Sequence, residues 1–442
     1  MLWAWCAINK KKRAELAESD NLRTPHVPRT LESGRATTSL WRYSVADSYD
    51  TPPQPASEKV RIGLSSIWKR VWSSDSTTAE AEAGSECLPL SESVLAELLL
   101  QPPWEAATTS LAAHLNPWLD DPSPDSLVQA VIGPPGSGVS EVVARWGKQV
   151  SGKIVAPADY GLILNPKLDF WKETGRDADS VIVIPQLERL YLRHSDGLDL
   201  IRQLAEWLWV SPQRVVIGCG SWAWAYLCHT LRIDAVFKSP LALESLDGEL
   251  LRSWFRPRHR GRYLVQTAGN REVIYPIEVA DEIAGSLAAA AADEEPEDKG
   301  ADVFQRIAAT SRGIPEVALA LWRKCLCEGE VEASGKKSFS LADAMTPIWV
   351  RPPQSLNLPS LPNAASTHEA IVLHTLLLHA GLPSPILFQL MPFPPSDVIA
   401  TLSALHDAEL ISEREGVWQV APLAYSNVRN FIRAETLLID LF

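Results

Sequence analysis

A glycine-rich stretch at residues 133–140 contains the residue types most suited to chemistry in this chain. It has the sequence GPPGSGVS, follows the apolar run 127–132, and precedes a helical pattern over 141–150. Glycines let successive backbone N–H groups turn toward phosphate oxygens, and a following helix N-terminus adds the positive end of its dipole. The stretch is a candidate phosphate-binding loop for ATP or ADP, with the candidate nucleotide-binding residues Gly133, Gly136, Ser137, Gly138, Val139 and Ser140.

The loop departs from the standard phosphate-loop motif at one position. The motif GxxxxGK[ST] is matched at Gly133, Gly138 and Ser140, whereas Val139 stands where the motif has lysine. That lysine reaches the β- and γ-phosphates as a point charge, and much of phosphoryl-transfer catalysis is charge stabilisation. Two interpretations stay open: a loop that still binds nucleotide, or a Gly/Pro turn between strand and helix with no ligand.

A second feature of nucleotide hydrolysis is expected at the end of the apolar strand 181–184. A Walker B aspartate there would hold Mg²⁺ through water, but the strand ends in Pro185. Glu188 follows and is a candidate to polarise a water; the alternative is a solvated helix carboxylate near Arg189. Loss of both the lysine and the aspartate predicts that Mg²⁺-dependent hydrolysis is lost.

The order of these segments resembles the core of AAA+ and STAND ATPases. Residues 181–188 are similar to the hhhhDQ-x-E pattern with Pro185 in the aspartate's place, and residues 311–318 are similar to the G-x-P lid motif. The resemblance covers roughly residues 105–330 and implies that Pro315 lies against the nucleotide. It also implies a polar γ-phosphate sensor after the third strand, for which the candidates are Cys219 and Ser221.

Alternating apolar and helical segments predict the fold that positions these residues. Four apolar runs, and a weaker fifth, are separated by helical stretches: 127–132, 153–156, 180–184, 214–219 and 235–237. Continuous apolar strands that alternate with helices indicate a buried parallel sheet. The prediction is an α/β fold, a three-layer P-loop core over 89–240 with a helical lead-in.

The remaining segments predict a lid and a small second domain. Residues 241–345 are expected to form a helical lid with an acidic solvated insertion at 278–300, and 346–365 a proline-rich linker. Residues 366–442 show three helices, a hairpin and a final helix, which is a winged-helix pattern. Ser366 and Glu369 form a capping box at its start.

Charge decides what the winged-helix domain can contact. Its third predicted helix and wing carry mainly carboxylates, for example Asp397, Asp407, Glu413 and Glu415, so nucleic acid is not an expected partner. An unidentified protein partner or self-association is expected instead. An arginine group that includes Arg256, Arg258, Arg260 and Arg262 either contacts phosphates or a partner, or is a lid surface neutralised by the chain's own carboxylates.

Residues 1–88 are predicted to be mostly disordered because they lack sustained hydrophobic periodicity. The exception is a basic amphipathic helix near 59–72. Its composition suits a peripheral contact with a membrane or a partner, and the alternative is packing on the chain's own body.

Composition narrows the function classes. The formal charge of −13 disfavours broad binding to nucleic acid. The chain has no run of about 18 uncharged apolar residues, so we predict no membrane-spanning helix. Six scattered cysteines without a CxxC pair predict no metal site and no disulfide framework, hence a cytoplasmic, reducing location.

Three hypotheses follow from these features. The first is a regulatory or scaffolding pseudo-ATPase that works through protein contacts. The second is an active ATPase that uses a non-standard arginine or one supplied by a neighbouring subunit. The third is a DNA-associated AAA+ regulator.

Overall fold

A computed structural model describes residues 41–46, 50–52, 88–176, 181–256, 263–267, 274–275, 299–328, 346–361 and 366–442. Several predictions from sequence lie outside these ranges: the basic helix at 59–72, residues 278–298 of the acidic insertion, and Arg258, Arg260 and Arg262.

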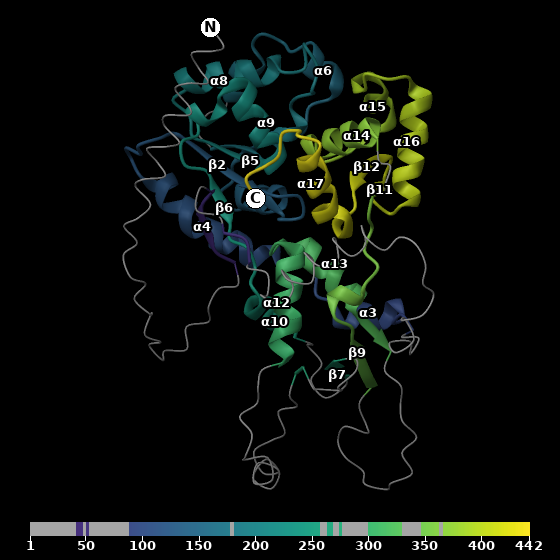
Figure 1. Ribbon diagram of the computed structural model, residues 1–442. Helices are drawn as coiled ribbons and strands as arrows, with labels where there is room; N and C mark the ends of the chain where they lie inside the picture. Colours follow the sequence, from purple (N-terminus) through teal and green to yellow (C-terminus); the bar gives the residue numbers. More distant parts are fainter. Residues whose placement is uncertain are drawn as a thin grey trace, which may run out of the picture. The chain divides into compact units, whose positions relative to one another are not determined.

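The central sheet has six strands in the order β1-β6-β2-β5-β4-β3 (Figure 1). Every pairing is parallel except that of β1 with β6. The parallel strands match the buried apolar runs, which confirms the predicted α/β class. The strands are β1 (Tyr43–Val45), β2 (Val128–Gly133), β3 (Lys153–Ile154), β4 (Ile182–Ile184), β5 (Val215–Gly220) and β6 (Leu241–Leu243).

Helices cover both faces of this sheet. The chain moves from β2 to β3 in one direction along the sheet and from β5 to β6 in the other. Right-handed crossovers therefore put the intervening helices α5 and α9 on opposite faces, which gives three layers. The core helices are α3 (Glu92–Leu98), α4 (Trp104–Asp120), α5 (Val139–Gln149), α6 (Tyr160–Leu164), α7 (Phe170–Gly175), α8 (Asp199–Val210) and α9 (Ser221–Leu231).

Two strand predictions were wrong or missing. Residues 235–237 are not a strand. Ala235 is the last residue of a 3-10 turn (Ile233–Ala235), and the fifth parallel strand is β6 instead. The apolar signal there reflects burial of Phe237 in the core and not extended backbone. Strand β1 was missed inside 1–88, because three residues are too short to show periodicity although Trp41 and Tyr43 are buried.

The lid contains a second sheet that the helical prediction missed. Its helices are α10 (Gly248–Trp254), α12 (Lys299–Ser311) and α13 (Pro315–Cys325). Strands β7 (Tyr263–Thr267), β8 (Leu326–Glu328) and β9 (Thr346–Val350) form a sheet in the order β7-β9-β8. Strand β9 begins the stretch that was interpreted as a proline-rich linker. Its partners are distant in sequence, so no local pattern reveals this pairing.

One cysteine expectation is also corrected. Cys327 is disulfide-bonded, whereas Cys219, Cys228 and Cys325 are free. Cys327 forms a β-bridge with Pro89, so the fold brings two segments together that are far apart in sequence. Cysteine spacing along the chain cannot show this proximity. No helix in the described ranges is long and apolar enough to cross a membrane.

Residues 366–442, here called the C-terminal module, have the predicted order of elements. The capping box at Ser366 and Glu369 is present, and the hairpin turns at Glu415 and Gly416, which both have positive φ. The elements are α14 (Thr367–Leu378), β10 (Leu382–Pro383), α15 (Ser384–Leu390), α16 (Pro395–Asp407), β11 (Ile411–Arg414), β12 (Val417–Val420) and α17 (Tyr425–Ala434). This is the helix and wing succession of a winged helix.

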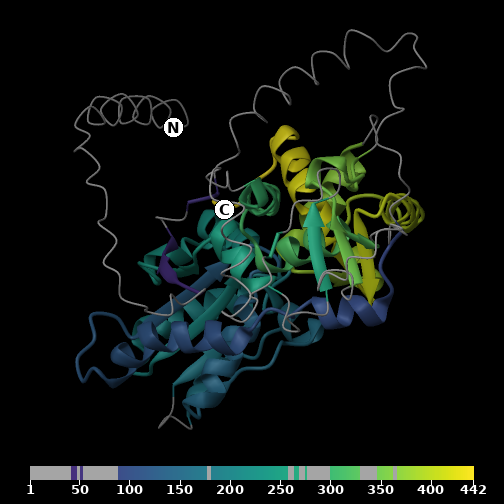
Figure 2. The same ribbon diagram turned by 90° about the horizontal axis from the view of Figure 1, so that it is seen from below.

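The module packs beside the core, as both ribbon views show (Figure 1, Figure 2). The Arg189 guanidinium donates to the carbonyl oxygens of Gly381 (3.0 Å) and Ala380 (3.1 Å), just past the end of α14. A cation is favourable there because it faces the negative end of the helix dipole. The Tyr191 hydroxyl donates to Leu378 O at 2.9 Å. The segment after β4 thus holds the end of α14.

Two buried histidines in this contact predict that it weakens as pH falls. Burial, with Arg193 nearby, lowers the pKa of His374 from 6.5 to about 4, and burial lowers the pKa of His379 to about 3. Both are neutral when packed, whereas exposed histidines bind protons below about pH 6.5. The stability they contribute is therefore complete above pH 6.5 and declines as pH falls toward 4. Between pH 7.5 and 5 the expected loss is roughly 2 kcal/mol per histidine.

Urea denaturation at these two pH values measures this effect. His379→Gln should reduce the loss that the two histidines cause by about half, since only His374 of the pair then remains at the contact. His229→Gln is the matched control, because His229 is exposed near the end of α9. An equal pH dependence in the His379→Gln variant and the unchanged chain would contradict the assignment.

Candidate functional site

A cavity of about 280 Å³ lies where the loop, the lid and the C-terminal module meet. Its walls come from the loop 133–140, the region after β4, the start of α9 and the start of α13, and in the C-terminal module from the end of α14, the wing strands and the start of α17. The charged residues that line it are Glu188, Arg189, Glu316 and Arg414. The cavity therefore combines backbone groups of the candidate phosphate loop with two side chains of each sign.

The loop has the backbone conformation that its glycines allow. Gly136 and Gly138 have φ of 86° and 73°, which side chains with a Cβ rarely adopt. Gly138 is the N-cap of α5 and no side chain caps the helix, so its first N–H groups have no partner within the helix. Gly138, Val139 and Ser140 all line the cavity. An anion in the cavity can accept hydrogen bonds from this helix N-terminus.

Ser137 supports the loop from inside. Its side chain is buried, and Oγ donates to Pro134 O at 2.6 Å. The backbone N–H of Ser137 donates to the same oxygen at 3.1 Å. Although Ser137 contributes to the cavity wall, its polar groups hold the turn and leave phosphate contacts to its neighbours.

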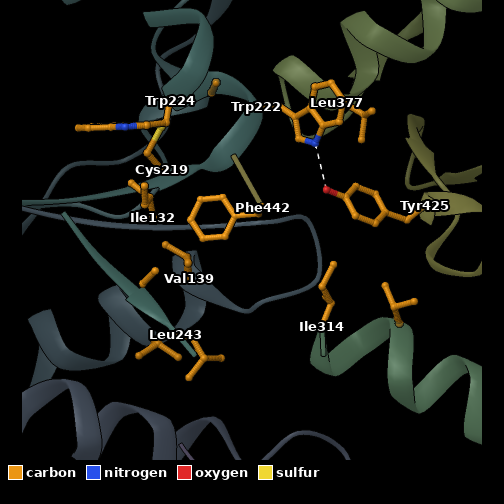
Figure 3. Packing of buried hydrophobic residues seen from close by; sticks show 14 of the residues in the cluster. Ile132, Val139, Cys219, Trp222, Trp224, Leu243, Ile314, Leu377, Tyr425 and Phe442 are labelled. Carbon is orange, nitrogen blue, oxygen red and sulfur yellow. Dashed lines mark hydrogen bonds between the residues drawn. The ribbon is translucent and has the colours of Figure 1, made fainter. Parts of the chain in front are cut away.

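Val139 points into the protein. It is 7% exposed and belongs to the hydrophobic core. A Cβ added at Gly133 would lie 2.9 Å from Val139 Cγ2, and one at Gly218 would lie 3.3 Å from Cγ1, so both methyls are closely packed. Figure 3 shows its side chain near Ile132 and Phe442. The position that holds lysine in the motif is here part of an apolar core.

Glu188 is buried, which removes the alternative of a solvated helix carboxylate. It lies in a 3-10 turn (Leu187–Arg189) and is 6% exposed. Its Oε2 accepts a hydrogen bond from the backbone N–H of Gly220 at 3.1 Å, and burial raises its pKa. The carboxylate thus links the segment after β4 to the end of β5. Pro185 provides no side-chain oxygen for a metal.

The two sensor candidates lie beside the cavity and do not line it. Cys219 is buried, and burial raises the pKa of its thiol. Ser221 Oγ donates to Asp440 Oδ2 at 2.5 Å. Their neighbours Gly220 and Trp222 form the wall instead. Trp222 is buried as expected for packing, but it also donates from Nε1 to the Tyr425 hydroxyl at 3.2 Å.

The lid contacts the loop one residue after Pro315. Pro315 begins α13, and the backbone N–H of Glu316 donates to Gly136 O at 3.1 Å. Glu316 and Val317 line the cavity, whereas Pro315 does not. Burial raises the pKa of the Glu316 carboxyl, and the charge of Arg414 opposes this shift.

Arg414 is the cavity cation that sequence analysis missed. It ends β11 in the wing, and its sequence neighbours Glu413 and Glu415 give this part of the wing a net negative charge. Arg256, from the predicted arginine group, does not line the cavity. Within the described ranges, no group of three or more His, Cys, Asp or Glu residues is arranged to hold a metal ion.

The strand order and the loop define an α/β P-loop fold with a helix-and-wing module. No protein-family model matches the chain, and no curated protein matches it. Similar solved structures include RuvB from Thermotoga maritima, at 16% identity and a TM-score of 0.29, covering 76% of this chain and 96% of RuvB.

Two further similar structures have 13% identity. Cdc6p from Pyrobaculum aerophilum has a TM-score of 0.32, and the match covers 81% of this chain and 97% of the Cdc6p chain. The Orc1 protein of Aeropyrum pernix, solved in complex with DNA, has a TM-score of 0.28, and the match covers 76% of this chain and 95% of the Orc1 chain. Likeness at this level carries no argument about what the present chain binds or does.

The packing of Val139 predicts that restoring the motif lysine is harmful. Val139→Lys places an ammonium group among closely packed methyls, and the expected loss is more than about 2 kcal/mol in the free energy of unfolding. Gln149→Lys, at an exposed site on the same helix, is the control and should change stability by less than about 0.5 kcal/mol. Urea denaturation measures both. Unchanged stability of Val139→Lys would show that the side chain turns into the cavity.

Proposed function

We propose that this chain is a regulatory P-loop protein of the AAA+ or STAND kind that binds ATP or ADP without efficient hydrolysis. The supporting observation is the uncapped N-terminus of α5, whose first residues line a cavity that is also lined by Arg414. Backbone N–H groups and an arginine together recognise phosphate oxygens. In this proposal Arg414 replaces part of the charge that the motif lysine would supply.

The same cavity lacks the groups that hydrolysis requires. Val139 supplies no charge, and Pro185 supplies no oxygen for Mg²⁺. Glu188 is the remaining carboxylate after β4, but it is buried and bound to the Gly220 N–H. A base held in this way is poorly placed to activate a water. Nucleotide would therefore act as a structural or regulatory ligand, and Mg²⁺ would contribute little.

Contacts with other proteins would carry the regulatory output. The nucleotide cavity is partly lined by the wing, so a bound ligand touches the core, the lid and the C-terminal module at once. A change in ligand occupancy would bias how the module is held. We propose that the module, with its acidic third helix, binds a protein partner or a second copy of the chain.

Arg414 also favours a second candidate function, an active ATPase that uses this non-standard arginine. An arginine near transferring phosphates stabilises developing charge. Turnover above background that disappears in Arg414→Ala would support this candidate. A DNA-associated role has no such favouring observation among the described residues.

Isothermal titration with ATP and ADP, with and without Mg²⁺, tests nucleotide binding directly. We expect binding of at least one nucleotide with little Mg²⁺ dependence.

Ser140→Asp puts a carboxylate at the helix N-terminus. The carboxylate stabilises the helix dipole but repels phosphate, so this variant should weaken nucleotide binding more than about tenfold. Arg433→Ala removes an exposed arginine of α17 and is the matched control for Arg414→Ala. No binding of either nucleotide would reduce the chain to a nucleotide-free scaffold.

Glu316 is expected to oppose phosphate binding. Glu316 lines the cavity, and its Oε2 would lie 3.6 Å from a Cβ added at Gly136, so Glu316→Gln should raise nucleotide affinity by about tenfold. Its raised pKa adds a pH signature: the unchanged chain should gain affinity relative to the variant as pH falls and the carboxyl is protonated. Titrations of both proteins from pH 8 to 5 measure the difference. A constant affinity ratio across that range would exclude Glu316 as the cause.

A further inference from the structure

Residues 438–442 return to the core after α17 and pack there without forming a helix or strand. Asp440 and Phe442 are buried, whereas Leu441 between them is 77% exposed. Leu438 O accepts a hydrogen bond from His374 Nε2 at 3.0 Å if that ring nitrogen is protonated. The segment is therefore held through the Leu438 carbonyl and the buried side chains of Asp440 and Phe442.

Asp440 joins the C-terminal module to the end of β5. Within the module, its carboxylate accepts from Arg429 Nε at 2.9 Å and from the Tyr425 hydroxyl at 3.2 Å. Across to the core, it accepts from Ser221 Oγ at 2.5 Å, at the first residue of α9. A buried carboxylate is stable only with such partners. The bond to Ser221 fixes one end of the segment on the core.

Phe442 provides the second anchor. Its side chain is 3% exposed, and Figure 3 shows the ring lying among Ile132, Val139 and Cys219. These residues belong to β2, the start of α5 and β5, next to the phosphate loop. The ring thus extends the apolar packing around Val139. Two side chains of opposite character, one anionic and one aromatic, hold the segment.

The segment is also linked by hydrogen bonds to two residues that line the cavity. The Tyr425 hydroxyl accepts from Trp222 Nε1 and donates to Asp440 Oδ2, so the three groups form one chain of hydrogen bonds. Trp222 and Tyr425 both line the cavity. When Asp440 is seated, neither ring can move without breaking this chain.

We infer that residues 438–442 form a latch that holds the C-terminal module on the core and restricts access of ligand to the cavity. Release frees Trp222 and Tyr425 and leaves α17 intact, because the latch has no secondary structure of its own to unfold. Short segments with few anchors are the ones that open at low free-energy cost. The part of this inference that concerns ligand access rests on the proposed nucleotide site. The part that concerns the contact between module and core does not.

Three single variants of the full chain test the latch. Phe442→Ala removes the aromatic anchor, and Ser221→Ala removes the polar anchor while keeping the pair of Asp440 and Arg429. Leu441→Ala is the matched control, since its side chain is exposed. Melting curves first identify which variants fold; Ser221→Ala loses a single oxygen and keeps the test valid if Phe442→Ala does not fold.

Hydrogen exchange of the backbone amides is the first measurement. Phe442→Ala should increase the exchange rates of residues 435–442 and of the start of α9 by more than about tenfold, with a smaller increase in Ser221→Ala and none in Leu441→Ala. Stopped-flow binding of a fluorescent ADP analogue is the second. Its association rate should increase in the order Leu441→Ala, Ser221→Ala, Phe442→Ala.

The outcomes separate the latch from the nucleotide proposal. Faster exchange without any binding of the analogue keeps the module contact, overturns control of access and counts against the proposed function. Binding by the unchanged chain with equal exchange and equal association rates in all variants overturns the latch alone. Faster exchange together with faster association supports both.

Discussion

The parallel pairing of β2 with β5 is the constraint on which the rest of the site depends. Gly133 pairs with Gly220 at the carboxyl ends of the two strands, so the phosphate loop and the start of α9 leave the sheet side by side. The loops that follow parallel strands meet at this edge. Glu188 then reaches Gly220 from β4, the next strand. Three segments that are far apart in sequence are placed around one cavity by a single register.

Burial accounts for the apolar residues at the two positions where the motifs have a charged residue. Val139 packs against the bare backbone of Gly133 and Gly218, and Pro185 packs its carbonyl against Gly218. A charged side chain in such a place needs a partner, and removing the charge removes that requirement. The charged residues of the cavity then come from the segment after β4 (Glu188 and Arg189), from the lid (Glu316) and from the wing (Arg414). The charged groups that the motif concentrates in one segment therefore lie on three segments here: the segment after β4, the lid and the wing.

Local patterns predicted the parts of the structure that are set locally. The loop, the strands β2, β4 and β5, and the module from Ser366 onward were found because periodicity, glycine turns and a capping box are short-range signals. The sheet β7-β9-β8 and the strand β1 were missed because their pairing partners are distant or their length is three to five residues. Arg414 and Asp440 were missed as site residues for the same reason. Their contacts form only when the module packs on the core.

Strand β1 has a consequence for how the chain can be divided. It covers the outer side of β6, and the opposite edge of the sheet, β3, has only two residues. Short and covered edges prevent strand-to-strand association between molecules. A fragment beginning at residue 88 would leave the polar backbone of β6 unpaired and would remove Trp41 from against Trp104 and Trp254. The segment around residues 41–46 therefore belongs with the α/β core in any fragment intended to keep this edge of the sheet covered.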